Sequence, residues 1–180
     1  MLKSKVVISL LPLIILILLF FVGFLAISKM QKEQDLSTKL DNMEEVYLPN
    51  FSFSNLYDPE DFLTNKDLIK SSYSLLNIFA SWCSGCVVEH DELLRLSKFI
   101  DIYAIAYQDI DKNTKKYLDK YQNPYKKIGI DRRGELSKIL MVKAIPETFL
   151  IDKNGKIIHR YQGVLNKEMI NFYKKILLDK

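Results

Sequence analysis

The sequence predicts an α/β domain that follows one N-terminal transmembrane helix, and three observations lead to this fold class. From Leu75 onward, near-continuous apolar runs alternate with stretches of helical period. This pattern is typical of buried parallel strands connected by helices. Two cysteines, the only ones among the 180 residues, stand where one such run gives way to a helix. Near the N-terminus, an uncharged segment is long enough to cross a bilayer.

The uncharged segment extends from Val6 to Ile27. At roughly 1.5 Å per helical residue it spans a hydrocarbon core of about 30 Å. Because Lys3 and Lys5 precede it and Ala26-Ile27-Ser28 could serve as a small-residue cleavage site, a cleaved signal peptide is the alternative. Signal peptides have apolar cores of typically ~7–15 residues, which is shorter than this run. We therefore expect an uncleaved membrane anchor over residues 1–28.

Residues 29–47 are mostly polar and are expected to form a tether to a soluble domain over residues 48–180. Lysines flank the apolar segment on both sides, so charge alone favours a cytoplasmic N-terminus only slightly. The short leader and the redox-type cysteine pair favour the same orientation. The expected location is the bacterial inner membrane, with a single span and the soluble domain in the periplasm.

The charge balance indicates no nucleic-acid partner. The formal net charge is +4, and the lysines are scattered along the sequence. A nucleic-acid-binding domain would instead carry a basic stripe or patch. We expect these lysines to form an ordinary solvated surface.

The cysteine pair lies between a predicted strand, Leu75–Ala80, and a predicted helix that begins at Cys83. Amide N–H groups at a helix N-terminus have no partner within the helix and favour an anion, hence a thiolate. Cys83 is therefore expected to be the exposed, attacking member. Cys86 shares a helix face with Val87 and His90 and is expected to be less accessible. Trp-Cys-x-x-Cys after a strand is the thioredoxin-type redox motif.

The cysteine pair has two other interpretations. A structural zinc site needs four ligands, whereas only His90 and His159 are available to join the two cysteines. A purely structural disulfide would close a very small loop, and by the loop-entropy argument it would stabilise the fold little. Redox chemistry is the prediction that the motif favours.

The segments before the cysteines are expected to add a short strand and a short helix. Leu48–Leu56 alternates apolar and polar residues, as a strand does. Asp58-Pro59 then begins a turn and a short helix. Its inward residues are expected to be Phe62, Leu63, Leu68 and Ile69. The cysteine helix is expected to end near Phe99.

The segments after the cysteines complete the predicted sheet. The expected elements are a strand Ile100–Tyr107, a helix Lys112–Tyr121, a strand Ile128–Asp131, a helix Glu135–Met141, strands Thr148–Ile151 and Lys156–Tyr161, and a helix Asn166–Leu178. Asn154-Gly155 between the last two strands is a strong hairpin signal. This order is that of a thioredoxin-like fold with an N-terminal extension and an inserted strand–helix segment.

From Leu48 onward, the chain also resembles the CcmG/DsbE group, the membrane-anchored thioredoxin-like proteins of cytochrome c maturation. The matching pieces are Leu76–Cys83, Glu89-His90, Asn123–Tyr125, Pro146–Asp152 and Asn154–Ile157. Trp-Cys-x-x-Cys is generic to thioredoxin-like proteins. Pro-Glu-Thr-Phe followed by Leu-Ile-Asp, starting at Pro146, is much more specific.

The resemblance implies a catalytic dithiol formed by Cys83 and Cys86, which needs no further cofactor. Its substrate would be the disulfide in the haem-binding Cys-x-x-Cys-His segment of apocytochrome c. A transmembrane thiol carrier of the DsbD or CcdA type would supply the electrons. Supporting residues at the substrate groove would be Trp82, Ile145, Pro146, Glu147, Glu89 and Asn77.

The chain departs from the family pattern at three positions. Ser84 stands where the family usually has proline, and Met141 and Ala144 stand where it usually has glycines. These departures affect the redox potential and the shape of the partner groove, while the thiol–disulfide chemistry is unchanged.

The Ile145–Pro146 bond is expected to be cis and to lie against the cysteine pair. The backbone of Ile145 would then be free to pair with an extended substrate segment. Glu147 would border the active site, where it could assist proton transfer or select basic partners. Trp82 would shield the cysteines and offer a flat docking surface, with ordinary core packing as the alternative.

Three polar residues near the cysteines have two interpretations each. General thioredoxins carry a buried acid at the position of Asn77, and an amide cannot relay a proton to Cys86. Water or Glu147 would have to do so, and Asn77 would be either a hydrogen-bonded core amide or a tuning residue. Glu89 is expected to be a solvated helix residue or part of an acidic groove rim. His90 is expected to be packed or capping rather than a ligand or base.

Two rival functions stay open at this point. The chain could be a broader extracytoplasmic reductase or isomerase that acts on many disulfides. It could also be a copper carrier for an oxidase, since such carriers share the fold and the anchor, and thiolates suit Cu(I). Copper carriers resemble Cys-x-x-x-Cys with a distant histidine, so the two-residue spacing here and Pro146-Glu147 argue against copper.

Overall fold

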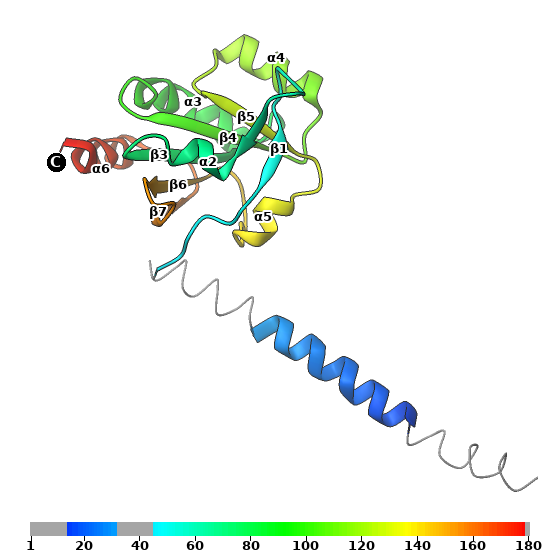
Figure 1. Ribbon diagram of the computed structural model, residues 1–180. Helices are drawn as coiled ribbons and strands as arrows, with labels where there is room; N and C mark the ends of the chain where they lie inside the picture. The colour runs from blue at the N-terminus through cyan, green and yellow to red at the C-terminus, as the bar shows by residue number, and fades with distance from the viewer. Residues whose placement is uncertain (1–13, 32–44, 179–180) are drawn as a thin grey trace, which may run out of the picture. The chain divides into compact units, whose positions relative to one another are not determined.

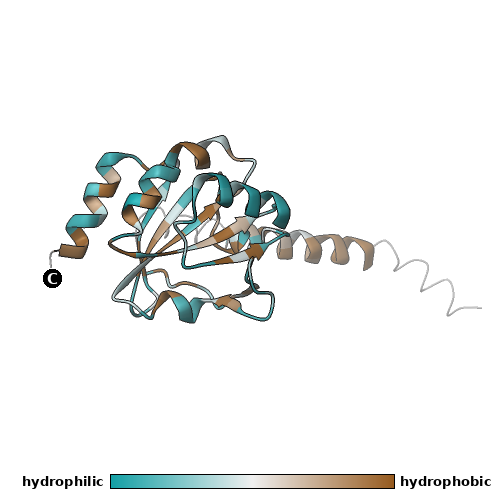
Figure 2. Ribbon diagram, turned by 90° about the horizontal axis from the view of Figure 1, so that it is seen from above, coloured by the Kyte–Doolittle hydropathy of each residue, from teal (hydrophilic) through white to brown (hydrophobic). Residues whose placement is uncertain are grey.

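The computed structural model describes residues 14–31 and 45–178 (Figure 1). They belong to two compact units, each described here by itself. The first contains a helix, Ile14–Gln31, whose side chains are all exposed. Figure 2 shows it as apolar along most of its length. By length and composition this helix is able to cross a membrane. Residues 1–13 of the predicted anchor and 32–44 of the predicted tether lie outside the described residues.

The second unit is built on a five-stranded sheet with the spatial order β5-β4-β3-β6-β7. Its strands are β3 (Tyr73–Phe79), β4 (Asp101–Tyr107), β5 (Lys127–Asp131), β6 (Glu147–Asp152) and β7 (Ile157–Gln162). The first three are parallel, and β6 and β7 run antiparallel to their neighbours. The order of these strands along the chain is the predicted one, and the central strand β3 leads directly into the cysteines.

Four of the helices connect or follow these strands: α3 (Ser84–Leu96), α4 (Asp111–Tyr121), α5 (Glu135–Ile139) and α6 (Lys167–Leu178). Leu93 and Leu96 of α3 join Tyr117 of α4 and Tyr173 of α6 in one buried cluster with the central strands. Side chains alternate between the two faces of a strand. Leu75, Asn77 and Phe79 therefore share one face of β3, and Leu75 and Phe79 belong to this cluster.

The element ends differ from the prediction by a few residues. Helix α3 ends at Leu96, and Phe99 after it is 60% exposed. Helix α5 ends at Ile139, two residues before its expected end at Met141, because Met141 adopts φ 54° in the left-handed region. In α6, Ile170 and Tyr173 are buried as expected, whereas Ile176 and Leu177 are only partly buried.

The predicted helix after Asp58-Pro59 is wrong in its first part. Residues Phe62–Thr64 form a strand, β2, which pairs antiparallel with β1 (Ser52–Ser54), and the helix α2 is only Asn65–Leu68. Strand pairing turns Leu63 inward and leaves Phe62 47% exposed. Ile69 is also exposed, at 38%.

The β1–β2 pair packs closely over the edge strand β5. A side-chain carbon added at Gly129 would lie 2.9 Å from Cβ of Phe53 and 3.0 Å from Cδ1 of Ile105. Glycine is therefore required there by close approach. At the other edge, the carbonyl of Val46 accepts from the N–H of Ile157, and the N–H of Leu48 donates to the carbonyl of Gly155 (2.7 Å).

Candidate active site

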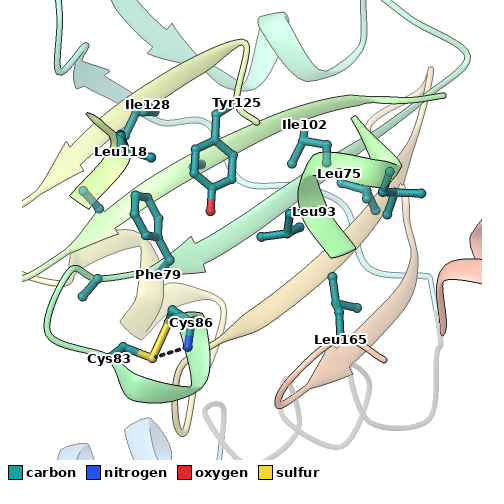
Figure 3. Close-up of a cluster of buried hydrophobic side chains, with 14 of the residues drawn as sticks. Leu75, Phe79, Cys83, Cys86, Leu93, Ile102, Leu118, Tyr125, Ile128 and Leu165 are labelled. Atoms are coloured by element: carbon teal, nitrogen blue, oxygen red, sulfur yellow. Dashed lines mark hydrogen bonds between the residues drawn. A yellow bond between two sulfur atoms is a disulfide. The ribbon is translucent and has the colours of Figure 1, made fainter. Parts of the chain in front are cut away.

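Cys83 and Cys86 form a disulfide where β3 passes into α3 (Figure 3). Cys83 is the N-cap residue of α3, and the N–H of Cys86 donates to its Sγ at an N···S distance of 3.1 Å. The predicted position at the helix N-terminus is therefore confirmed. Unpaired N–H groups in this first turn stabilise negative charge on sulfur, so a reduced Cys83 is placed to be a thiolate.

Both cysteines are buried, which corrects the expectation that Cys83 is exposed. Cys83 is 6% exposed and Cys86 is 1% exposed. Cys83 is therefore the more exposed of the two, as predicted, but the difference is small. The loop before β6 covers the pair: the carbonyl oxygen of Ile145 lies 3.7 Å from Sγ of Cys83. A substrate must therefore approach along this loop.

The Ile145–Pro146 bond is cis, as predicted. Pro146 lies against the turn between the cysteines, because a side-chain carbon added at Gly85 would be 3.1 Å from its Cδ. The same carbon would be 3.2 Å from Cγ2 of Val164. A side-chain carbon at position 85 would require both neighbours to move by a few tenths of an ångström.

Trp82 is 60% exposed, so core packing does not explain it. Its ring lies beside Tyr107, with centroids 6.4 Å apart, and its Nε1–H faces the carbonyl of Gln108 at 3.4 Å. The side chain therefore presents an aromatic surface next to the cysteines.

Asp109 fixes the loop that carries Trp82, and sequence reasoning missed it. Its carboxylate accepts from the N–H and hydroxyl of Ser81 at 2.6 and 2.9 Å, and from the hydroxyl of Thr114 at 2.9 Å. It is 7% exposed. Asp109 does not cap α4, whose N-cap residue is Ile110, so a capping pattern in the sequence could not have identified it.

Glu89 is fully buried, which contradicts both interpretations given for it. It lies one helical turn after Cys86, and its Oε1 accepts from Nδ2 of Asn77 at 3.0 Å. Its Oε2 accepts from the N–H of Leu165 at 2.9 Å. Burial raises the pKa of Glu89 to about 7, although both hydrogen bonds act in the opposite direction by stabilising the carboxylate. The residue is a buried acid that can exchange a proton near neutral pH.

Asn77 of β3 connects Glu89 to Thr148 of β6 and to Tyr125, in the loop between α4 and β5. Its Nδ2 also donates to the hydroxyl of Thr148 at 3.0 Å, and its Oδ1 accepts from the hydroxyl of Tyr125 at 2.9 Å. Burial raises the pKa of Tyr125 well above its usual value, so the hydroxyl remains a donor. Asn77 is a hydrogen-bonded core amide, and its partner Glu89 gives the site the buried acid that Asn77 itself lacks.

Glu147 does not border the substrate face, which corrects the prediction. It is fully buried on β6 and forms an ion pair with Arg160 of β7. Arg160 also donates from Nη2 to the carbonyl of Met141 at 2.8 Å. Met141 is the left-handed residue that stands where the family usually has glycine. The buried pair therefore holds the start of the 141–146 loop that covers Cys83.

His90 is a packed histidine, as expected. Its Nδ1 lies 2.8 Å from the hydroxyl of Tyr117, and its Nε2 lies 2.8 Å from the carbonyl of Gln122. Burial lowers the pKa of His90. The Tyr117 hydroxyl also donates to the carbonyl of Cys86 at 3.0 Å, so Tyr117 of α4 contacts both His90 and Cys86 of the cysteine helix. Within residues 14–31 and 45–178, no three His, Cys, Asp or Glu side chains are grouped to hold a metal ion.

Comparison with known proteins identifies the family. The model of the Redoxin family matches residues 43–177. The thiol:disulfide interchange protein DsbE of Pseudomonas aeruginosa is 39% identical over 122 residues, which cover 67% of this chain and 67% of that protein. DsbE of Haemophilus influenzae is 27% identical over 172 residues, which cover 95% of this chain and 94% of that protein.

Among solved structures, a thiol-disulfide oxidoreductase of Bacteroides fragilis shares the fold, with a TM-score of 0.63 and 24% identity. The match covers 74% of this chain and 100% of that structure. The chain therefore belongs to the Redoxin family, within the group of DsbE-type thiol:disulfide interchange proteins, and is a thiol-disulfide oxidoreductase with a thioredoxin-like fold.

Proposed function

We propose that this protein is a membrane-anchored, extracytoplasmic reductant of the haem-binding disulfide of apocytochrome c, supplied with electrons by a transmembrane thiol carrier. The observation that carries the proposal is the Cys83–Cys86 pair at the N-terminus of α3, covered by the loop that ends in Ile145 and cis-Pro146. The resemblance to the CcmG/DsbE group, strongest in the run that starts at Pro146, supports the choice of substrate.

The chemistry proceeds by two thiol–disulfide exchanges. The Cys83 thiolate attacks one sulfur of the substrate disulfide, forms a mixed disulfide and releases the other substrate sulfur as a thiolate. The Cys86 thiolate then attacks Sγ of Cys83, which breaks the mixed disulfide and releases the second substrate thiolate. The substrate gains two electrons, and the Cys83–Cys86 disulfide forms. The thiol carrier reverses the sequence and restores the dithiol.

The second exchange needs a group that takes the proton of Cys86. Glu89 is suited to this role because it lies three residues further along the same helix face and has a pKa of about 7. Glu147, the candidate that the sequence suggested, is engaged by Arg160 instead.

Substrate binding is proposed to use the backbone of Ile145 and the face of Trp82. The β6 ladder with β3 begins at Glu147, so Ile145 lies just outside it and can pair with an extended segment. Trp82 is 60% exposed beside the pair and supplies an apolar surface for the residues around a substrate cysteine.

The anchoring part of the proposal is supported by the helix Ile14–Gln31, which is apolar and exposed along its length. The redox pair after it favours a periplasmic domain. Carbonate extraction of membranes would test the anchor, since a cleaved leader would release the domain in soluble form.

The decisive experiment is to trap the redox state of Cys83 and Cys86 in cells with an alkylating reagent. A mostly reduced pair that becomes oxidised when the thiol carrier is deleted is the expected result. Loss of the gene should also lower the level of mature cytochrome c. A pair found mostly oxidised in normal cells, with cytochrome c unaffected by loss of the gene, would favour a general oxidant.

A further inference from the structure

The end of the domain opposite the disulfide carries a basic surface that the redox chemistry does not use. Ser71 and Ser72 precede β3, and Lys98 and Phe99 follow α3, whereas the disulfide lies at the other end of both elements. Strand residues advance ~3.3 Å each and helical residues ~1.5 Å each, so this end is roughly 20 Å from the cysteines. We define the basal surface by Ile69, Lys98, Phe99, Lys126, Lys153 and Lys174.

The basal surface surrounds a hollow of about 390 Å³. Lys98 and Lys126 line it together with the hydroxyl-bearing Ser72 and Ser97. The acidic group in the hollow, Asp101, accepts from the hydroxyl of Ser71 at 2.9 Å and pairs with Lys126 at 3.3 Å. The hydroxyl of Ser97 donates to the carbonyl of Leu94 at 3.0 Å, whereas the ammonium groups of Lys98 and Lys126 and the hydroxyl of Ser72 suit the oxygen atoms of a phosphate group.

Exposed apolar side chains accompany the lysines. Phe99 is 60% exposed at the hollow, and Nζ of Lys174 lies 4.5 Å from the centroid of its ring. Lys153 is exposed and its N–H donates to the carbonyl of Ser72, which places it beside the same hollow. An exposed aromatic ring among lysines is typical of surfaces that rest in the headgroup layer of a membrane.

The chain also enters the domain at this end. Leu48 pairs with Gly155 in the turn between β6 and β7, and Val46 pairs with the first residue of β7, Ile157. Lys153, at the start of that turn, contacts Ser72. The 13 residues 32–44 separate this entry point from the apolar helix. A chain of that length reaches at most about 45 Å, so the basal surface stays within reach of a bilayer that holds the helix.

We propose that the basal surface docks on an anionic lipid surface, with lipid phosphates in the hollow between Lys98 and Lys126. Attraction of lysines to anionic headgroups and burial of Phe99 at the interface hold it there. This inference rests on the proposed anchor and is independent of the redox substrate. Docking holds the disulfide roughly 20 Å above the lipid, so substrate and electron donor must present their cysteines at that height.

The test uses the full chain in lipid nanodiscs of phosphatidylcholine alone and of phosphatidylcholine with phosphatidylglycerol. Lysine acetylation rates are measured by mass spectrometry. In the anionic discs, Lys98, Lys126, Lys153 and Lys174 should react several-fold more slowly than in neutral discs. Lys112 and Lys116, on the half of α4 nearer the disulfide, should react equally in both. Protection should fade at high salt because exposed charges are screened.

Two matched variants test whether docking depends on the lysines of the basal surface. The test variant carries K98Q, K153Q and K174Q, and the control carries K112Q, K115Q and K116Q. Each basal lysine removed should lower the equilibrium constant for docking about fivefold, whereas the control should dock like the wild type. Quenching of Trp82, the only tryptophan, by brominated lipids should be absent in all three proteins.

Equal acetylation in neutral and anionic discs, equal loss in both variants, or quenching of Trp82 would each overturn the proposal. So would protection that arises only after an acidic protein is added, since the occupant would then be that protein. Reduction of a small disulfide by the same samples reports the redox chemistry separately. Failure to incorporate into either disc would show instead that the anchor is absent.

Discussion

Replacing Glu89 with glutamine should change the way in which the stability of the domain depends on pH. The pKa of Glu89 is about 7 in the folded protein against an ordinary value of 4.5. Between these values the folded state binds more protons than the unfolded state, so the stability of the wild type falls as pH rises. From pH 5 to pH 8 this single group should remove about 2.5 kcal/mol, at ~1.36 kcal/mol per pKa unit.

The Glu89→Gln variant cannot titrate and should lack this loss. Its amide must place an NH₂ group against either the N–H of Leu165 or Nδ2 of Asn77, and this mismatch costs the variant about 1–3 kcal/mol independently of pH. The difference in unfolding free energy between wild type and variant should therefore be largest at pH 5. Between pH 5 and pH 8 the unfolding free energy of the wild type, relative to that of the variant, should fall by about 2.5 kcal/mol.

Urea unfolding followed by circular dichroism measures this difference at pH 5, 6, 7 and 8. It can be made on the oxidised second unit, since the buried cluster lies entirely within that unit. Glu92→Gln is the matched control, because Glu92 is on the same helix and pairs at the surface with Arg95. A difference that stays constant from pH 5 to pH 8 would show that burial does not raise the pKa of Glu89, and the proton-acceptor role would fail with it.

Three further outcomes are expected. Cys86→Ser should accumulate mixed disulfides with substrate on non-reducing gels and Cys83→Ser should not; faster alkylation of Cys86 than of Cys83 in the reduced protein would contradict this assignment. Tyr125→Phe leaves a buried amide oxygen without its donor and should lower the unfolding free energy by about 1–3 kcal/mol in urea titrations, whereas an unchanged midpoint would refute the contact. Arg160→Met should destabilise by about 3–5 kcal/mol, because it leaves the Glu147 carboxylate buried without its charge partner. Adding Glu147→Gln should recover part of the loss, and no recovery would mean that the two residues are not coupled.

The order of elements and the position of the cysteines could be predicted because both depend on local pattern. Apolar residues spaced at a period of two mark strands, and those spaced at a period of 3.6 mark helices. Cys83 comes shortly after a predicted strand in the sequence, so its place at the end of that strand does not depend on tertiary contacts. The prediction failed at Phe62–Thr64, where three residues are too few for either period to be distinguished. Pairing with β1 decided that segment, and a partner strand is not visible in local spacing.

By itself, the sequence determined the thioredoxin-like order of strands and helices, the dithiol at the strand–helix junction and the apolar N-terminal segment. Only the tertiary structure decided what the acids near the site do. The backbone N–H of Leu165, 76 positions further along the chain, donates to the buried Glu89. Glu147 forms an ion pair because Arg160 lies on the neighbouring strand. The charge state and exposure of a polar side chain depend on the elements that cover it, and these come together only when distant parts of the chain pack.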